Sequence, residues 1–148
     1  MNYSIQDGYL PVRDFHRLFS AAGWGDPSDD VIAVTLKNSF AVFSVTDESG
    51  RVLAMARLIG DGAMAFYLKD VVVDPAYQGQ GIGKALLKFV ESYILDQMPA
   101  GAKALFELTA AKGKEGFYQK LGFTANPNDN SGPGLTKHLS VDCVEPTK

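Results

Sequence analysis

A strand that passes through a glycine-rich loop into a long helix constrains this chain more than any other feature. Residues 70–94 read DVVVDPAYQGQGIGKALLKFVESYI. The β-branched start predicts a strand, Pro75 ends it, and apolar residues spaced three and four apart from residue 82 onward predict a helix. The glycines between strand and helix leave backbone N–H groups bare at the positive end of the helix dipole, which suits a phosphate group.

The spacing of this loop excludes two common phosphate-binding motifs. A Walker loop needs glycine five residues before its Gly-Lys pair, where this chain has Gln78, and a hydroxyl residue after the lysine, where it has Ala85. A dinucleotide fingerprint needs glycine in place of Lys84 and a loop that follows its strand directly, whereas residues 74–78 intervene here. The loop therefore favours another phosphate-bearing ligand.

The hydrophobic pattern elsewhere predicts a mixed α/β fold in a single domain spanning residues 1–148. Helices are expected at residues 11–24, 28–39, 82–98 and 114–123, and strands at residues 39–47, 51–60, 64–73 and 103–109, with one or two more between Phe123 and Val141. The sheet is expected to be mostly antiparallel, with one parallel strand–helix–strand crossover through the long helix and helices on both faces. Strict alternation places Tyr67, Lys69, Val71 and Val73 on one face of their strand and Leu68, Asp70 and Val72 on the other.

Composition narrows the class of partner. A net charge of −3 gives no basic surface for nucleic acid, and no apolar run approaches the length of a membrane span. The N-terminus lacks the pattern of a secretory signal, and the single cysteine, Cys143, cannot form an intrachain disulfide, which fits the cytoplasm. His16 and His138 add few soft ligands, so no metal site is expected.

Two motifs carry a resemblance to a known family. Gln78-x-x-Gly81-x-Gly83, after a valine strand and an Asp-Pro pair, resembles the acyl-CoA signature of the GCN5-related N-acetyltransferases, the GNAT superfamily. The segment GFYQKLGF at residues 116–123 resembles the closing helix of that family. The order of elements agrees over nearly the whole chain, and small bacterial members related to arylalkylamine N-acetyltransferases look most similar.

The resemblance implies an enzyme that transfers an acetyl group from acetyl-CoA to a primary amine by direct attack in a ternary complex. Amides of the glycine loop would hold the pyrophosphate, and the valine strand would bind the pantetheine arm like an added strand. The implied cofactor-binding residues are Val71, Val72, Val73, Gln78, Gly79, Gln80, Gly81, Ile82, Gly83 and Lys84. The acceptor is a small-molecule or protein amine, and related proteins are often homodimers.

Among the catalytic residues that the resemblance implies, some match the family pattern and others depart from it. Tyr118 matches the family's general acid, which protonates the departing thiolate. The histidines that arylalkylamine acetyltransferases use are absent, because Tyr67 and Lys69 stand in their places, so the base is a water chain ending at Tyr67 or Glu107, with Asp70 a third choice. An asparagine expected after the last predicted strand of the crossover is also missing, which leaves a second function open: an acyl-CoA-binding sensor without turnover.

Overall fold

The structure of the protein, a computed structural model, describes residues 1–142, so Cys143 lies outside the described part. The chain divides into two compact units, residues 1–109 and the residues from 110 onward. The expectation of one domain over residues 1–148 stays a prediction.

The first unit is built on a five-stranded sheet in the order β1-β2-β3-β4-β5. Its strands are β1 (Tyr3–Asp7), β2 (Ala41–Asp47), β3 (Val52–Gly60), β4 (Ala65–Val73) and β5 (Leu105–Leu108), and its helices are α1 (Val12–Ala21), α2 (Asp29–Lys37), the short 3₁₀ turn η1 (Pro75–Tyr77) and α3 (Ile82–Gln97). The first three strand pairings are antiparallel, and β4 pairs with β5 in parallel across α3. The expected mixed sheet and its single parallel crossover are confirmed, whereas the edge strand β1 was not expected because it is short and holds little apolar sequence.

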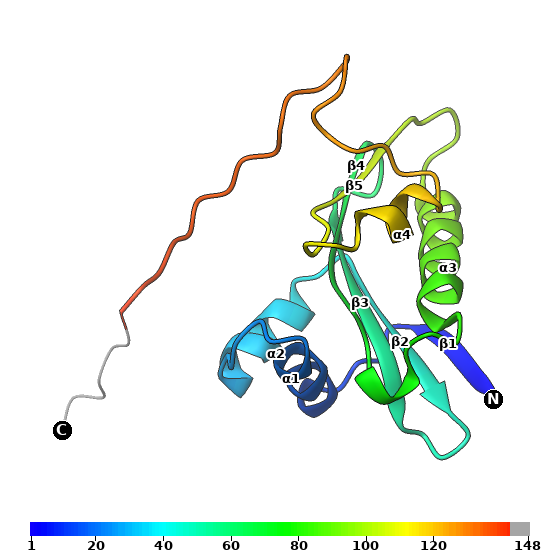
Figure 1. Cartoon of the computed structure of the whole chain (residues 1–148), viewed down its shortest axis with the longest axis vertical. Coiled ribbons are helices and arrows are strands. Elements are labelled where there is room, and N and C mark those ends of the chain that lie inside the picture. The colour runs from blue at the N-terminus through cyan, green and yellow to red at the C-terminus, as the bar shows by residue number, and fades with distance from the viewer. Residues whose placement is uncertain (143–148) are drawn as a thin grey trace. The chain divides into compact units, whose positions relative to one another are not determined.

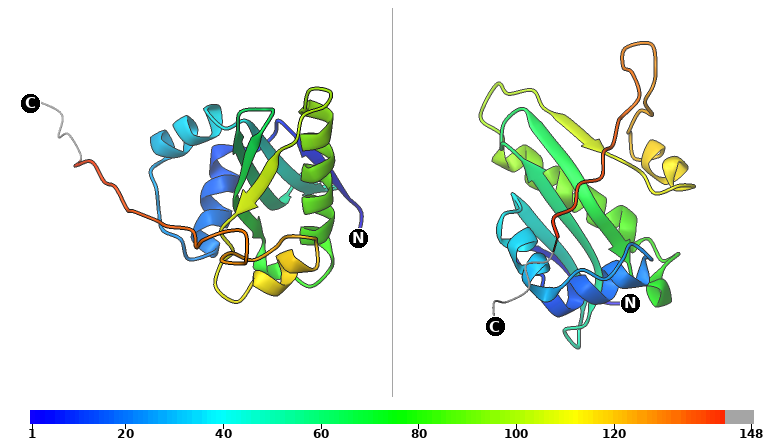
Figure 2. Two further views of the ribbon diagram at one scale, coloured as in Figure 1. Left: turned by 90° about the horizontal axis from the view of Figure 1, so that it is seen from above. Right: turned by 90° about the vertical axis from the view of Figure 1, so that its left-hand side faces the viewer.

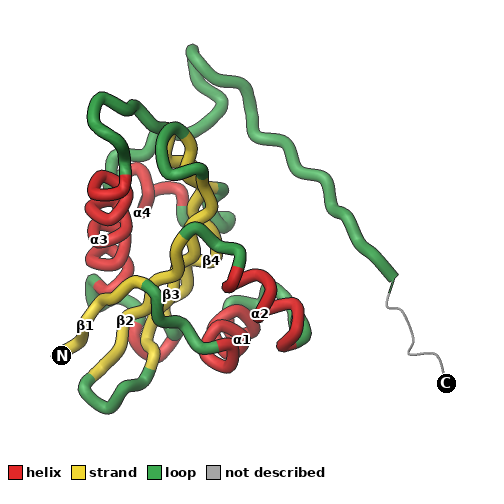
Figure 3. Tube along the Cα trace, turned by 180° about the vertical axis from the view of Figure 1, so that it is seen from behind, coloured by secondary structure: helices red, strands yellow, loops and turns green. Residues whose placement is uncertain are grey.

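Helices α1 and α2 cover one face of the sheet (Figures 1 and 3). Phe15 and Leu18 of α1 are buried in a cluster with Ile32 of α2 and Met55 of β3, so the predicted apolar stripe of α1 is confirmed. The start of α2 is fixed by Ser28, whose hydroxyl accepts the Val31 N–H at 3.3 Å.

Helix α3 lies along the opposite face, behind the sheet in the right-hand view of Figure 2. Its Phe89 and Tyr93 meet Phe43 of β2 with ring centroids 6.1 and 5.2 Å apart, both edge to face. Ile82, Leu86, Val90 and Ile94 continue the same stripe into the core, as the spacing predicted. The sheet is thereby covered by helices on both faces.

Strand β4 contains a bulge that the sequence pattern did not predict. Lys69 pairs with Arg57, but Val72 pairs with Met55, so Ala56 alone lies opposite both Asp70 and Val71. The extra residue reverses the alternation, and Val72 packs in the cluster beneath α1, on the face that carries Lys69. The predicted assignment of faces within β4 was therefore wrong beyond residue 69.

Over residues 110–142 the second unit contains one short helix, α4 (Glu115–Gln119). Gly122 follows it with φ 96°, and the Phe123 N–H bonds the Tyr118 carbonyl at 3.2 Å, as expected for a left-handed helix end. The one or two strands predicted between Phe123 and Val141 were wrong, because the structure has no strand in residues 124–142. Prolines and glycines interrupt that segment, and its only bridge joins Asn128 to Ser131.

Candidate active site

The glycine loop presents unhindered backbone at the start of α3. Gly81 is the N-cap of the helix with φ 82° and Gly79 has φ 77°. Apart from the adjacent residues of the chain, nothing lies within 4 Å of the position that a side chain on either would take. The first helical bond runs from the Ala85 N–H to the Gly81 carbonyl at 3.1 Å, so the N–H groups of residues 82–84 precede the helical ladder. No side chain caps them. Open space, orphan donors and the helix dipole together fit a diphosphate.

The loop is anchored at its beginning. The Gln78 side chain donates to the Val73 carbonyl at 3.0 Å, and Ile82 is buried, so these two residues offer a ligand backbone more than side chain. The Asp74 carboxylate accepts the Ala76 N–H at 3.0 Å and caps η1, the turn that leads into the loop.

A cluster of charges fixes Asp74 in turn. Its Oδ2 lies 2.8 Å from Arg17 Nη1 of α1 and 3.1 Å from Arg51 Nη2, and Arg17 Nη2 also donates to the Val52 carbonyl at 2.7 Å. Burial disfavours the charged carboxylate, but the Ala76 N–H and the two guanidinium groups outweigh it and lower the pKa of Asp74. The cluster joins α1 and β3 to the head of the glycine loop.

The other half of the candidate binding surface is an open edge of β4. Strand β5 pairs with residues 65–68 of β4 and ends at Leu108, although β4 continues to Val73 (Figure 2). Among the described residues no strand pairs with residues 69–73 on this side. Val71, Val72 and Val73 lie in that stretch, where an extended ligand arm can add as a further strand.

Asp70 has an unusual backbone in the middle of this edge. Its φ is 55°, and no other residue of 1–142 except glycine has a positive φ. Its carboxylate Oδ2 lies 2.8 Å from Arg57 Nε, and the two side chains are only 9% and 13% exposed. This engagement with Arg57 makes Asp70 a poor choice for the general base.

The two remaining base candidates lie side by side. Tyr67 of β4 and Glu107 of β5 are register partners, so both side chains emerge on the face that carries Lys69. The Tyr67 hydroxyl hydrogen-bonds the Thr109 hydroxyl just past the end of β5, and Lys69 Nζ lies 6.0 Å from the centre of the Tyr67 ring. Glu107 is exposed. The structure thus joins Tyr67, Glu107 and Thr109 where β4 and β5 stop pairing.

Tyr118 belongs to α4 of the second unit. Its ring makes edge-to-face contacts with Phe117 and Phe123, at centroid distances of 5.0 and 5.9 Å. Burial raises the pKa of the Tyr118 hydroxyl above its ordinary value, so the group is protonated at neutral pH. A protonated phenol is the form that a general acid needs.

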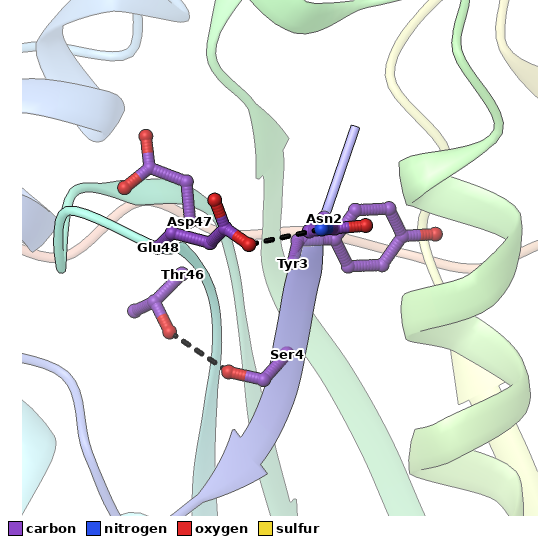
Figure 4. A pocket seen from close by; sticks show the side chains of 6 residues that line it. All are labelled: Asn2, Tyr3, Ser4, Thr46, Asp47 and Glu48. Carbon is purple, nitrogen blue, oxygen red and sulfur yellow. Dashed lines mark hydrogen bonds between the residues drawn. The ribbon is translucent and has the colours of Figure 1, made fainter.

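A shallow hollow of about 220 Å³ lies elsewhere in the first unit, between β1 and the end of β2 (Figure 4). Hydrogen bonds from Asn2 to Glu48 (2.9 Å) and between Ser4 and Thr46 (3.2 Å) cross it. It shares no residue with the glycine loop or with the open edge of β4, and it is too open to enclose a ligand.

The sequence reasoning missed Arg17, Arg57 and Thr109. Arg17 binds Asp74, 57 residues further along the chain, and Arg57 binds Asp70, 13 residues further along. No local sequence pattern predicts such distant pairs. Asp74 could have been found, because an aspartate directly before proline is a helix N-cap signal. No group of three or more His, Cys, Asp or Glu side chains that could hold a metal is present in residues 1–142.

Comparison with known proteins agrees with this geometry. The family model described as the acetyltransferase (GNAT) domain matches residues 38–125. The match spans the sheet from β2 onward, the glycine loop and α4, and the chain therefore belongs to the GNAT acetyltransferase family. The resemblance drawn from the two motifs is confirmed.

Individual relatives fit the same family. The chain is 36% identical to a soybean (Glycine max) histone acetyltransferase, TAP1, over 84% of this chain and 57% of that protein. It is 31% identical to a chloroplastic rice (Oryza sativa subsp. japonica) serotonin N-acetyltransferase 2, over 80% of this chain and 59% of that protein. The chain thus spans little more than half the length of these curated relatives.

A solved GNAT-family acetyltransferase of Streptococcus pneumoniae superposes with a TM-score of 0.70 at 23% identity, covering 95% of this chain and 98% of the other. At that identity the likeness supports the fold alone. No helix in residues 1–142 is both long enough and apolar enough to span a membrane.

Proposed function

We propose that this chain is an acetyl-CoA-dependent N-acetyltransferase that acts on a primary amine by direct attack in a ternary complex. One observation carries the proposal: in a member of the GNAT family, a strand with an open edge leads through the short turn η1 to a bare glycine loop at a helix start. A diphosphate and an extended amide-bearing arm are the two parts of coenzyme A that such a surface suits.

The first unit supplies the binding groups. Amides of residues 79–84 bind the diphosphate, with Lys84 adding a positive charge, and the backbone of residues 71–73 binds the pantetheine arm. A main-chain N–H in the same stretch polarises the acetyl carbonyl, a contact for which single donors contribute about 3 kcal/mol to transition-state stability. Acetyl-CoA supplies the acyl group as a thioester.

Proton transfer falls to Tyr118 as the acid and to water ordered by either Glu107 or Tyr67 as the base. Water ordered by Glu107 or Tyr67 accepts the proton that the amine loses as it attacks, and Thr109 holds the Tyr67 hydroxyl in place. Tyr118 donates its phenolic proton to the sulfur as the carbon–sulfur bond breaks. The balance is one new carbon–nitrogen bond, one broken carbon–sulfur bond and one free thiol.

The experiment that tests this proposal follows thiol release from acetyl-CoA over a panel of amines. The panel includes an arylalkylamine and a histone-tail peptide, since the relatives are named for serotonin and for histones. The transferase predicts release that saturates with one class of amine. Coenzyme A binding in calorimetry without release for any amine would instead favour the sensor, and absence of binding would refute both functions.

We place the protein in the cytoplasm as a homodimer without a nucleic-acid or membrane partner, although some relatives are chloroplastic.

A further inference from the structure

We propose that Arg57 is a positioning residue for acyl transfer, which acts through Asp70 to hold the β4 bulge and thereby the direction of the backbone at residues 71–73. The proposal rests on the acetyl-transfer function above. It assigns to Arg57 and Asp70 a role distinct from general base catalysis.

The bulge and the unusual backbone coincide. Ala56 lies opposite both Asp70 and Val71, and Asp70 is where φ becomes positive. A residue with a side chain adopts this conformation at an energetic cost, and aspartate tolerates it better than most. Such strain persists only where surrounding contacts hold it.

The ion pair with Arg57 is the contact that holds it. Arg57 lies on β3 directly beside the bulge, and its Nε reaches Asp70 Oδ2 at 2.8 Å with both side chains largely buried. Burial of two charges is costly, and their attraction often only repays that cost, so a gain in stability is a weak explanation for the pair. The positive φ of Asp70 and the buried ion pair both cost energy. Together they fix the conformation of the backbone at the bulge.

That conformation decides where the neighbouring backbone points. Without the bulge, strict alternation would move Val72 off the face beneath α1 and rotate the amides of residues 71–73 with it. These residues form the part of β4 that has no strand partner on the β5 side, which is the proposed thioester-binding edge. A donor misplaced there by about 1 Å costs about a hundredfold in rate.

The test compares the double variant Arg57→Met/Asp70→Asn, which leaves no orphan buried charge, with Asp70→Asn alone. Asparagine tolerates positive φ and can still accept a hydrogen bond from Arg57, so the single variant should keep most of the activity. The matched control is Arg13→Met, because Arg13 is 84% exposed and reaches Asp14 only at 3.7 Å.

We expect the double variant to lower kcat about 10- to 100-fold, while KM for acetyl-CoA and the Kd of coenzyme A change less than about threefold. A crystal structure of this variant should show residue 70 back at negative φ and the bulge lost. The control should match the wild type in all three constants.

Two results would overturn the proposal: a double variant with kcat equal to that of the control, or a crystal structure in which the bulge survives. If the wild type itself releases no thiol with any amine, the acetyl-transfer function fails, while the crystal structure still decides whether Arg57 holds the bulge.

Discussion

Three residues along the proposed binding surface have left-handed backbone: Gly79 (φ 77°), Gly81 (φ 82°) and Asp70 (φ 55°). The two glycines take this conformation without strain and place no side chain of their own in front of the donors. Asp70 takes it at a cost that its ion pair with Arg57 offsets. In each case the side chain, or its absence, serves to aim main-chain groups, which is why the chemistry here depends on conformation at single positions.

Tyr118→Phe tests the proposed general acid. We expect kcat to fall about 10²- to 10⁴-fold, because the phenylalanine has no proton to give, while the Kd of coenzyme A stays within about threefold. The measurement is thiol release at saturating acetyl-CoA together with calorimetry. The exposed Tyr9, substituted in the same way, is the control and should have no effect. Equal losses of binding and turnover would show that Tyr118 only supports packing.

The raised pKa of Tyr118 also predicts the shape of the pH profile. A general acid works in its protonated form, which persists below its pKa, and burial raises that pKa above the ordinary value of about 10. We therefore expect no loss of kcat from this group between pH 7 and about 9.5. A basic limb within that range that disappears in Tyr118→Phe would contradict the assignment.

At the scale of elements, helix α1 and the glycine loop are joined by one buried carboxylate. Asp74 is 6% exposed and caps η1 through the Ala76 N–H. Its carboxylate also accepts hydrogen bonds from Arg17 of α1 and from Arg51, which directly precedes β3. At Gly79 and Gly81 no side chain holds the loop, since the position that a side chain would take is open space. Its position thus depends on the charge cluster at its head.

Asp74→Asn should lower the free energy of unfolding by about 2 kcal/mol at pH 7, since it weakens charged hydrogen bonds to partly exposed arginines. The sign of the pH dependence follows from the lowered pKa of Asp74: its contribution is complete above the unfolded-state value of about 3.9 and is lost as pH falls through the lower folded-state value. The difference from wild type should therefore shrink below about pH 4. Urea unfolding from pH 7 to pH 2.5 measures it.

Asp96→Asn, on the exposed side of α3, is the matched control and should change stability little at any pH. The Asp74 variant should also weaken coenzyme A binding, because the loop loses its anchor. A stability difference that stays constant down to pH 2.5 would mean that the carboxylate charge is not what Arg17 and Arg51 recognise.

For the molecule as a whole, periodicity predicted most of the helices and strands, because each buries a face that its own sequence encodes. The bulge in β4 could not be predicted, because the residues KDVVV are compatible with a regular strand as well as with a bulged one. The residue that holds the bulge, Arg57, lies on another strand. The glycine loop was foreseen because glycine spacing is local. The one or two strands expected between Phe123 and Val141 failed for the opposite reason: a strand needs a partner elsewhere in the chain, and no strand pairs with this segment among the described residues.

That segment gives a prediction for the whole chain. Leu135, Leu139 and Val141 are 93%, 86% and 94% exposed. The side chain and backbone of Asn128 form hydrogen bonds with residues 125–131 of the same segment. A chain ending at Ala125, the last residue of the family match, should therefore unfold within about 2 °C of wild type and bind coenzyme A within about threefold. The full-length variant with serine at residues 135, 139 and 141 should behave the same way, because side chains in water contribute little to folding. A loss of more than about 5 °C in either protein would mean that the segment is covered in solution, and sedimentation of both would then show whether a second copy of the chain covers it.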